Sequence, residues 1–173
     1  MKKWLLIALA ITTTCACGYK LVDWHSELFA TIGIPPVSAE GPARSLAPRL
    51  HDALIERCLA GSSLQPVKAH DADLVLKSRL NGYRENIIAT DSDGRTKRVQ
   101  FTMNVTFELW RGGTKLWSLS NYQYADQFQV STTQVEYRNE SIYVQDQAMD
   151  AVAELVAANV ALVIQELEES ETR

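Results

Sequence analysis

The sequence is poor in the residues that most often carry out chemistry. It has only three cysteines and three histidines among 173 residues. It also lacks the G-x-S-x-G, H-E-x-x-H and Gly-rich phosphate-loop motifs of common hydrolases, zinc proteases and nucleotide-binding enzymes. Because His25, His51 and His70 lie in separate segments, we expect no metal centre and no cofactor. An enzyme would have to build its site from these histidines and Cys58, so we predict that the protein is not an enzyme.

Excess positive charge is also missing, since the formal net charge is −4. An acidic chain is a poor match for the phosphate backbone of nucleic acids, so we predict no nucleic-acid partner. The composition is that of an ordinary globular protein, with 46% hydrophobic and 22% charged residues. A chain of this length buries roughly 70% of the surface that it exposes when unfolded, so one domain can form without metal or disulfide support.

The N-terminus has the layout of an export signal. Lys2 and Lys3 precede an apolar run at residues 4–11, and small residues then lead to Cys17. The apolar run is shorter than the ~20 residues that a membrane-spanning helix requires, and we predict no later span either. Residues 1–16 are therefore predicted to be a signal peptide.

The sequence Ala16-Cys17-Gly18 resembles the bacterial lipoprotein signal, in which the cysteine after the cleavage point is acylated. This resemblance implies that Cys17 is the lipid attachment site, with Cys15 as a rival acceptor and a plain secretory signal as the alternative. The residue after Cys17 is Gly18, and not the aspartate that retains lipoproteins at the inner membrane. We therefore expect the outer membrane. Cys58 would then be the remaining thiol, and its place on the apolar side of a predicted helix is typical of a buried cysteine.

The sequence of the first half of the mature chain predicts a tether, a strand, a helix and a second strand. Residues 17–30 show no periodicity and are expected to form the tether, and residues 31–37 form a short strand that ends at Pro35 and Pro36. Helical spacing begins after Ser45, a candidate cap, and Pro48 falls in the first turn. The second strand covers residues 73–83, and residues 84–98 are expected to form a long hairpin connection around Asp93-Gly94.

The second half shows the clearest patterns. Apolar and polar residues alternate from Val99 to Leu109, which predicts a strand with one dry face. After a turn at Gly112-Gly113, residues 115–130 form the returning strand, and a phase change predicts a bulge near Ser120. A long helix follows at residues 142–168, and residues 169–173 form an acidic tail that we interpret as a solvated end.

This order, β-α-β-β-β-α, predicts an α+β fold in which residues 31–168 form a single domain. The economical arrangement is a four-stranded mixed β-sheet with both α-helices packed on one face. The opposite face would be polar and would meet water or a partner. Its expected residues are Thr102, Asn104, Thr106, Glu108 and Trp110.

One charged feature stands out on this acidic chain. Arg95, Lys97 and Arg98 follow the Asp93-Gly94 turn, so three cations lie at an exposed hairpin tip. Such a group can bind a phosphate or a sugar acid. The alternative is a charged edge that prevents aggregation between strands.

Taken in order, these elements resemble the LptE-type lipopolysaccharide-assembly lipoproteins over nearly all of the mature chain. The resemblance rests on five elements: the mature start, the first strand, the approach to the second strand, the hairpin turn and the long C-terminal helix. The short motifs are Cys17-Gly18-Tyr19-Lys20-Leu21, Thr31-Ile32-Gly33-Ile34-Pro35, Asp71-Ala72-Asp73-Leu74-Val75-Leu76 and Asp93-Gly94-Arg95. The sequence departs from the family at Thr14, where leucine is usual, and at residues 37–41, which lack the usual Asn and Arg.

The resemblance implies an outer-membrane, lipid-anchored protein that faces the periplasm. Its expected partners are an LptD-type outer-membrane β-barrel, which it plugs and helps to assemble, and lipopolysaccharide during transport to the cell surface. It also implies lipopolysaccharide contact at Arg95, Lys97 and Arg98. The alternative is another outer-membrane lipoprotein, such as a secretion-channel subunit or an envelope scaffold.

Overall fold

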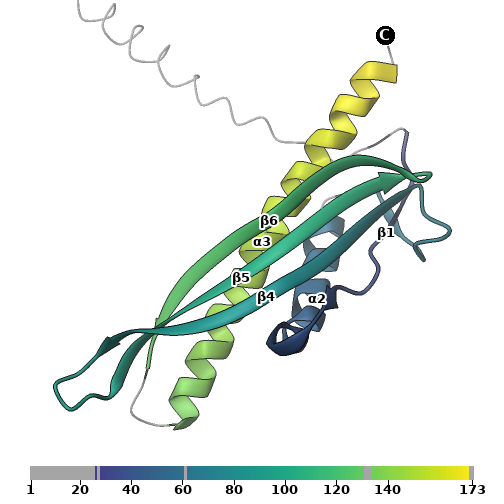
Figure 1. The fold of residues 1–173 in the computed structure, drawn as a ribbon. Coiled ribbons are helices and arrows are strands. Elements are labelled where there is room, and N and C mark those ends of the chain that lie inside the picture. The colour runs from purple at the N-terminus through teal and green to yellow at the C-terminus, as the bar shows by residue number, and fades with distance from the viewer. Residues whose placement is uncertain (1–25, 27, 61, 131–133, 172–173) are drawn as a thin grey trace, which may run out of the picture.

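The computed structural model describes residues 26, 28–60, 62–130 and 134–171. The predicted signal peptide, Cys15, Cys17 and most of the predicted tether lie outside these residues. Strands and helices follow one another along the chain as Figure 1 shows. In order they are β1 (Thr31–Gly33), β2 (Ser38–Ala39), the 3-10 helix η1 (Gly41–Ser45), α2 (Ala47–Leu59), β3 (Gln65–Pro66), β4 (Leu74–Thr90), β5 (Thr96–Arg111), β6 (Thr114–Gln129) and α3 (Gln134–Glu171).

The sheet is mixed, as predicted, but it has six strands and not four. Strands β4, β5 and β6 form a long antiparallel meander. Strands β1 and β2 pair in parallel with successive parts of β4, and β3 pairs in parallel with β1. The prediction missed β2 and β3 because each has two residues, which is too short to show a periodicity of two.

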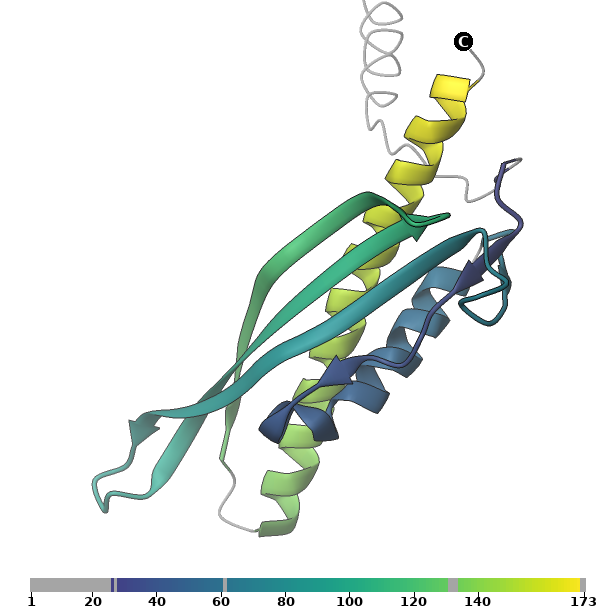
Figure 2. The ribbon, with the colours of Figure 1, turned by 45° about the vertical axis from the view of Figure 1, so that its right-hand side comes forward.

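Both helices cover the same face of the sheet, which confirms that part of the prediction (Figures 1 and 2). Strand β5 supplies the centre of the core, because every second side chain from Val99 to Leu109 is at most 5% exposed. The predicted alternation is therefore confirmed residue by residue. The opposing helix residues include Leu50, Leu54, Met149, Val152, Val156 and Val160. Two amphipathic layers thus bury one continuous apolar interior.

The predicted long connection at residues 84–98 is wrong. Strand β4 continues to Thr90 and β5 begins at Thr96, so only residues 91–95 form the turn. The sequence hides this extension because Arg84, Glu85 and Asn86 are followed by two isoleucines, which gives no alternation. Backbone pairing with β5 stabilises the strand where the side-chain pattern does not indicate one.

The predicted bulge in β6 is confirmed. Phe107 pairs with Leu119 and Val105 pairs with Tyr122, so β6 has one extra residue opposite Thr106. Asn121 takes a left-handed backbone conformation with φ of 53°, which asparagine tolerates better than most residues. Because of the extra residue, the odd positions before the bulge and the even positions after it face the helices alike.

The helices differ from the prediction at their ends. Helix α2 begins after Leu46 and has no side-chain cap, so Ser45 is not the cap; its hydroxyl donates to the carbonyl of Pro42. The prediction of a proline in the first turn is confirmed. Helix α3 begins at Gln134, eight residues before the predicted start.

Helix α3 is long and apolar enough to cross a membrane by length and composition, because residues 140–171 include a window of mean hydropathy 1.5. Half of that window is buried inside the fold. A core helix that packs against a sheet meets the same criteria. The helix therefore gives weak evidence for a membrane span.

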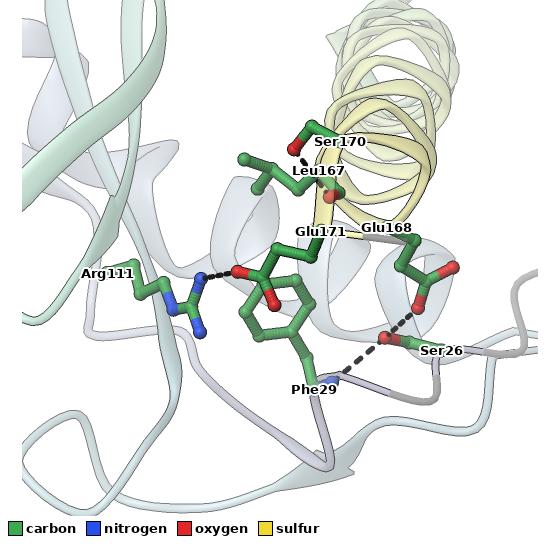
Figure 3. Close-up of polar contacts among 7 residues, drawn as sticks. All are labelled: Ser26, Phe29, Arg111, Leu167, Glu168, Ser170 and Glu171. Atoms are coloured by element: carbon green, nitrogen blue, oxygen red, sulfur yellow. Dashed lines mark hydrogen bonds and ion pairs between the residues drawn. The ribbon is translucent and has the colours of Figure 1, made fainter. Parts of the chain in front are cut away.

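At one end of the molecule, segments that are far apart in the sequence contact one another (Figure 3). The Ser26 hydroxyl donates to the Glu168 carboxylate over 2.6 Å, and the Arg111 guanidinium is paired with Glu171 over 2.9 Å. Arg111 also lies 4.8 Å above the ring of Phe29, which is buried. We call these five residues the terminal cluster. The division into tether, domain and tail stays a prediction, but packing within the described residues includes Phe29 and Glu171.

Asp73 fastens β1 at the same end. Its Oδ2 accepts hydrogen bonds from the backbone amides of Ala30 and Thr31 and from the Thr31 hydroxyl. In return, the Asp73 amide donates to the Thr31 hydroxyl oxygen over 2.9 Å. The Thr31 hydroxyl and the two amides hold the pKa of this carboxyl below its usual range. The Asp73 side chain thus adds to the backbone pairing that holds this three-residue strand.

Candidate functional site

The basic hairpin tip is organised by one carboxylate. Asp91 Oδ1 accepts hydrogen bonds from the amides of Asp93 and Arg95, at 3.0 and 2.8 Å, and Gly94 turns the chain with φ of 75°. The Lys97 amine lies 4.0 Å from Asp91 Oδ2. This network is a local turn that fixes the backbone from which the three predicted cations project.

Two of these cations are uncommitted. Arg95 and Arg98 are exposed, and neither has an ion pair or a side-chain hydrogen bond with any residue that the structure describes. Exposed guanidinium groups of this kind can form bidentate bonds with a phosphate or a carboxylate. Lys97 differs from them because Asp91 partly neutralises it.

Apolar side chains lie beside these cations. Ile87 and Ile88 are 63% and 45% exposed, and the pairing of β4 with β5 is irregular here. Ile87 pairs with Val99 and Ala89 with Arg98, so Ile88 is the extra residue of a bulge. Exposed isoleucines next to free cations make this end of the hairpin suited to a ligand with both anionic and apolar parts.

The outer face of the sheet, opposite the helices, carries the polar residues that the sequence predicted. Trp110 lies between two lysines, with the Lys77 and Lys115 amines 4.5 and 5.8 Å from its ring centroid. Glu108 accepts hydrogen bonds from the Lys115 amine and from the Trp110 indole N–H. The hydrogen bond from Lys115 contributes most, and the one from Trp110 next, to a lowered pKa of Glu108. The carboxyl group therefore stays ionised at neutral pH.

A groove of about 500 Å³ lies next to this group. Its floor spans three strands, and the connection between β1 and β2 forms one wall. The Asn81 amide donates to the Thr106 hydroxyl over 2.8 Å and lies 3.3 Å from Asn121 Oδ1. Arg79 also lines the groove and has no polar side-chain partner among the described residues. Lys77, Arg79 and Asn121 were not predicted as site residues, since only strand register brings them together.

The residues considered for chemistry remain apart. Cys58 is buried, and its burial raises the pKa of the thiol to about 12, so it stays protonated at neutral pH. His70 lies 3.1 Å from Asp71 on the surface, whereas His51 belongs to α2. In the described part of the chain, no three His, Cys, Asp or Glu side chains are placed to hold a metal ion. His25 lies outside that part.

The family follows from the extent of a sequence match. The family model described as LptE, lipopolysaccharide-assembly, matches residues 29–160, which is more than half of the chain. The chain belongs to the LptE family. The resemblance read from the sequence is thereby confirmed, and the chain is placed among non-enzymatic envelope lipoproteins of lipopolysaccharide assembly. No curated protein sequence matches the chain.

Solved structures agree on the fold. A protein of Xanthomonas campestris matches with a TM-score of 0.60 at 11% identity, over 84% of this chain and 91% of that chain. Rare lipoprotein B of Shewanella oneidensis gives 0.56 at 14% identity, over 79% and 98%. Lipoprotein B of Nitrosomonas europaea gives 0.53 at 14% identity, over 83% and 92%. At these identities the likeness supports the LptE fold and does not transfer individual residues.

Proposed function

We propose that this protein is an outer-membrane lipoprotein, anchored through Cys17, that plugs and helps to assemble an LptD-type barrel. In this role it binds lipopolysaccharide during transport to the cell surface. The family match over residues 29–160 is the observation that carries the proposal. The protein faces the periplasm, performs no bond chemistry and requires no cofactor.

The hairpin tip is the proposed lipopolysaccharide contact. Arg95 and Arg98 are free to bind phosphate groups, and Lys97 adds a third positive charge beside Asp91. Ile87 and Ile88 offer exposed apolar surface next to them. An anionic amphiphile has both parts that such a surface can bind, because phosphates pair with guanidinium groups and acyl chains avoid water.

The barrel partnership is tested by affinity purification of the tagged, full-length lipoprotein from detergent-solubilised outer membranes. Mass spectrometry should find a stoichiometric LptD-type barrel in the eluate. Recovery of a different assembly would favour the alternative, a secretion-channel subunit or an envelope scaffold. Recovery of no barrel would overturn the proposed role.

The lipopolysaccharide contact is tested with a matched pair of double variants. Arg95→Glu with Arg98→Glu should weaken binding to purified lipopolysaccharide by at least tenfold. Arg44→Glu with Lys68→Glu changes the net charge equally at exposed positions away from the tip, and should bind as the wild type does. Lys97 is left unchanged because its reversal would disturb Asp91 and the turn. Equal binding by both variants would remove the tip from the site.

The anchor is tested by labelling cells with a palmitate analogue. Cys17→Ser should abolish labelling and release the protein from membranes, because the anchoring acyl chains are lost. Cys15→Ser should leave labelling intact. The reverse pattern would move the anchor to Cys15, and labelling of neither protein would favour the plain secretory signal.

A further inference from the structure

Charge is segregated between the two layers of this acidic protein. Strand register places Lys77 opposite Glu108, Arg79 opposite Thr106, and Arg84 opposite Thr102. Lys115 is paired with Trp110. Paired residues share a face of the sheet, so these four cations lie on the outer face. We call Lys77, Arg79, Arg84 and Lys115 the basic sheet face; on the described strands β4 to β6, Glu108 is the one acidic residue that shares it.

The helix layer has the opposite charge. From Glu140 to Glu171, α3 carries eight carboxylates and no lysine or arginine. The cations of α2 are paired with it, since Arg49 lies 2.7 Å from Asp146 and Arg57 lies 3.9 Å from Asp150. The cations of α2 are therefore paired within the fold, whereas Arg79 and Arg84 on the sheet have no ion pair with a described residue.

The fold accounts for Lys77 and Lys115 through Trp110 and Glu108, but not for the two arginines of the basic sheet face. Arg79 and Arg84 have no ion pair or side-chain hydrogen bond with any described residue. Charges on an edge strand can prevent aggregation, but β4 is flanked by β2 and β5 at Arg79. Edge protection thus cannot explain this arginine, and a free guanidinium in a groove suggests a partner outside the chain.

The shape of this face favours an inserted side chain. The groove of about 500 Å³ brings Arg79 and Lys77 together, beneath the wall formed by Pro35 and Pro36. Asn81 and Thr106 already bond to each other at its floor. Glu108 and Asn121 also line the groove, and its charged donors left for a partner are the two cations, which fit a carboxylate.

We infer that the basic sheet face is the surface with which this protein docks against an acidic protein surface of its barrel, with carboxylates of the barrel bound in the groove by Arg79 and Lys77. This inference rests on the proposed barrel partnership. It assigns the sheet to the barrel and leaves the hairpin tip to lipopolysaccharide. The acidic helix α3 then faces away from the acidic partner surface, which avoids repulsion between like charges.

The test uses the full-length lipoprotein co-expressed with its barrel and purified through a tag. Lys77→Glu with Arg79→Glu should reduce barrel recovery at least tenfold at physiological salt, and wild-type recovery should fall as salt is raised. Arg44→Glu with Lys68→Glu is the control of equal charge change and should recover the barrel fully. Lys77→Gln with Arg79→Gln should give an intermediate loss, and circular dichroism identifies any variant that fails to fold.

The outcomes separate the two proposals. If the wild type recovers no barrel, the proposed function fails and this docking surface fails with it. If all variants recover the barrel equally, only the docking surface fails. If Lys77→Glu with Arg79→Glu keeps the barrel but loses lipopolysaccharide binding, the face belongs to an anionic lipid and the inference is overturned.

Discussion

The two ends of the sheet use arginine in different ways. At the terminal cluster, Arg111 is paired with Glu171 and lies over Phe29. Its charge thus connects β5 to α3 and to the segment that precedes β1. At the hairpin tip, Arg95 and Arg98 form no ion pair or side-chain hydrogen bond with any residue that the structure describes. The comparison teaches that position in the sheet does not decide the role of a cation. Contacts with distant parts of the chain mark a structural arginine, and their absence marks one available to a ligand.

The largest expected effect comes from the apolar centre of the terminal cluster. Phe29→Ala should lower the free energy of unfolding by about 3–5 kcal/mol, because it leaves a cavity at a side chain that is 2% exposed. Urea unfolding of the mature chain, followed by circular dichroism, measures this loss. Leu28→Ala is the control, since Leu28 is 37% exposed. An equal loss in both variants would mean that Phe29 is not a core residue.

A smaller loss is expected at the carboxylate that fastens β1. Asp73→Ala should cost about 0.5–1.5 kcal/mol, because three donors lose their acceptor and water replaces it at this exposed site. Asp71→Ala is the neighbouring control and should cost less than about 0.5 kcal/mol, as its partner His70 is on the surface.

This contribution should depend on pH. The pKa of Asp73 is lowered in the folded protein, so its stabilisation is fully present above the unfolded pKa of about 3.9. It is lost as pH falls through the lower, folded value. The difference in unfolding free energy between wild type and Asp73→Ala should therefore shrink below about pH 4. A difference that is constant from pH 7 to pH 2.5 would contradict the assigned hydrogen bonds.

The ion pair of the terminal cluster should contribute less. Arg111→Met should lower the free energy of unfolding by under about 1 kcal/mol, because both partners are substantially exposed. A double-mutant cycle with Glu171→Gln isolates the pair, and the coupling should weaken at high salt. A coupling near zero, with a loss in Arg111→Met that salt does not change, would indicate packing on Phe29 as the dominant contact of Arg111.

The smallest change in stability is expected at the tip. Arg95→Glu with Arg98→Glu should alter the free energy of unfolding by no more than about 0.5 kcal/mol, since neither side chain supports the described fold. The same variant is expected to lose lipopolysaccharide binding. A loss of stability above about 1 kcal/mol would show that these cations hold the hairpin together, and the contrast between the two ends would disappear.

The hydrophobic periodicity of the sequence predicted the long elements of the fold correctly. The alternation from Val99 to Leu109 gave β5 and its buried face, and the phase change near Ser120 gave the bulge. The two-layer arrangement followed from amphipathic helices and a one-sided sheet. These features depend on many side chains in register, so local exceptions do not obscure them.

The errors lie where backbone pairing decides the structure. Strands β2 and β3 exist because β4 and β1 offer hydrogen bonds to two residues each. The far half of β4, which includes Ile87 and Ile88, is held by pairing with β5 and has no apolar alternation of its own. Ser45 has the chemistry of a cap, but the preceding 3-10 helix η1 directs its hydroxyl to Pro42.

The same distinction applies to the two candidate binding surfaces. Arg95, Lys97 and Arg98 could be found from the sequence because a turn signal and three cations are adjacent in the chain. The groove could not, because Arg79, Thr106 and Asn121 come from three strands. Only the pairing register, including the bulge, brings these residues together.

The bulge at Asn121 also limits how the length of this strand can vary. Strand β6 changes phase there, so Trp117 and Leu119 before it and Tyr122 and Tyr124 after it face the same layer. Deleting one of the two bulge residues, Ser120 or Asn121, would restore uniform pairing and keep all four of these side chains on the helix layer, whereas deleting a residue elsewhere in the strand would turn the side chains on one side of the deletion to the opposite face. Substitutions along the strand change one contact each, whereas a deletion away from the bulge reverses the two faces of part of the strand. Homologous chains with this fold should therefore lose a residue of β6 at the bulge more readily than at any other position of the strand.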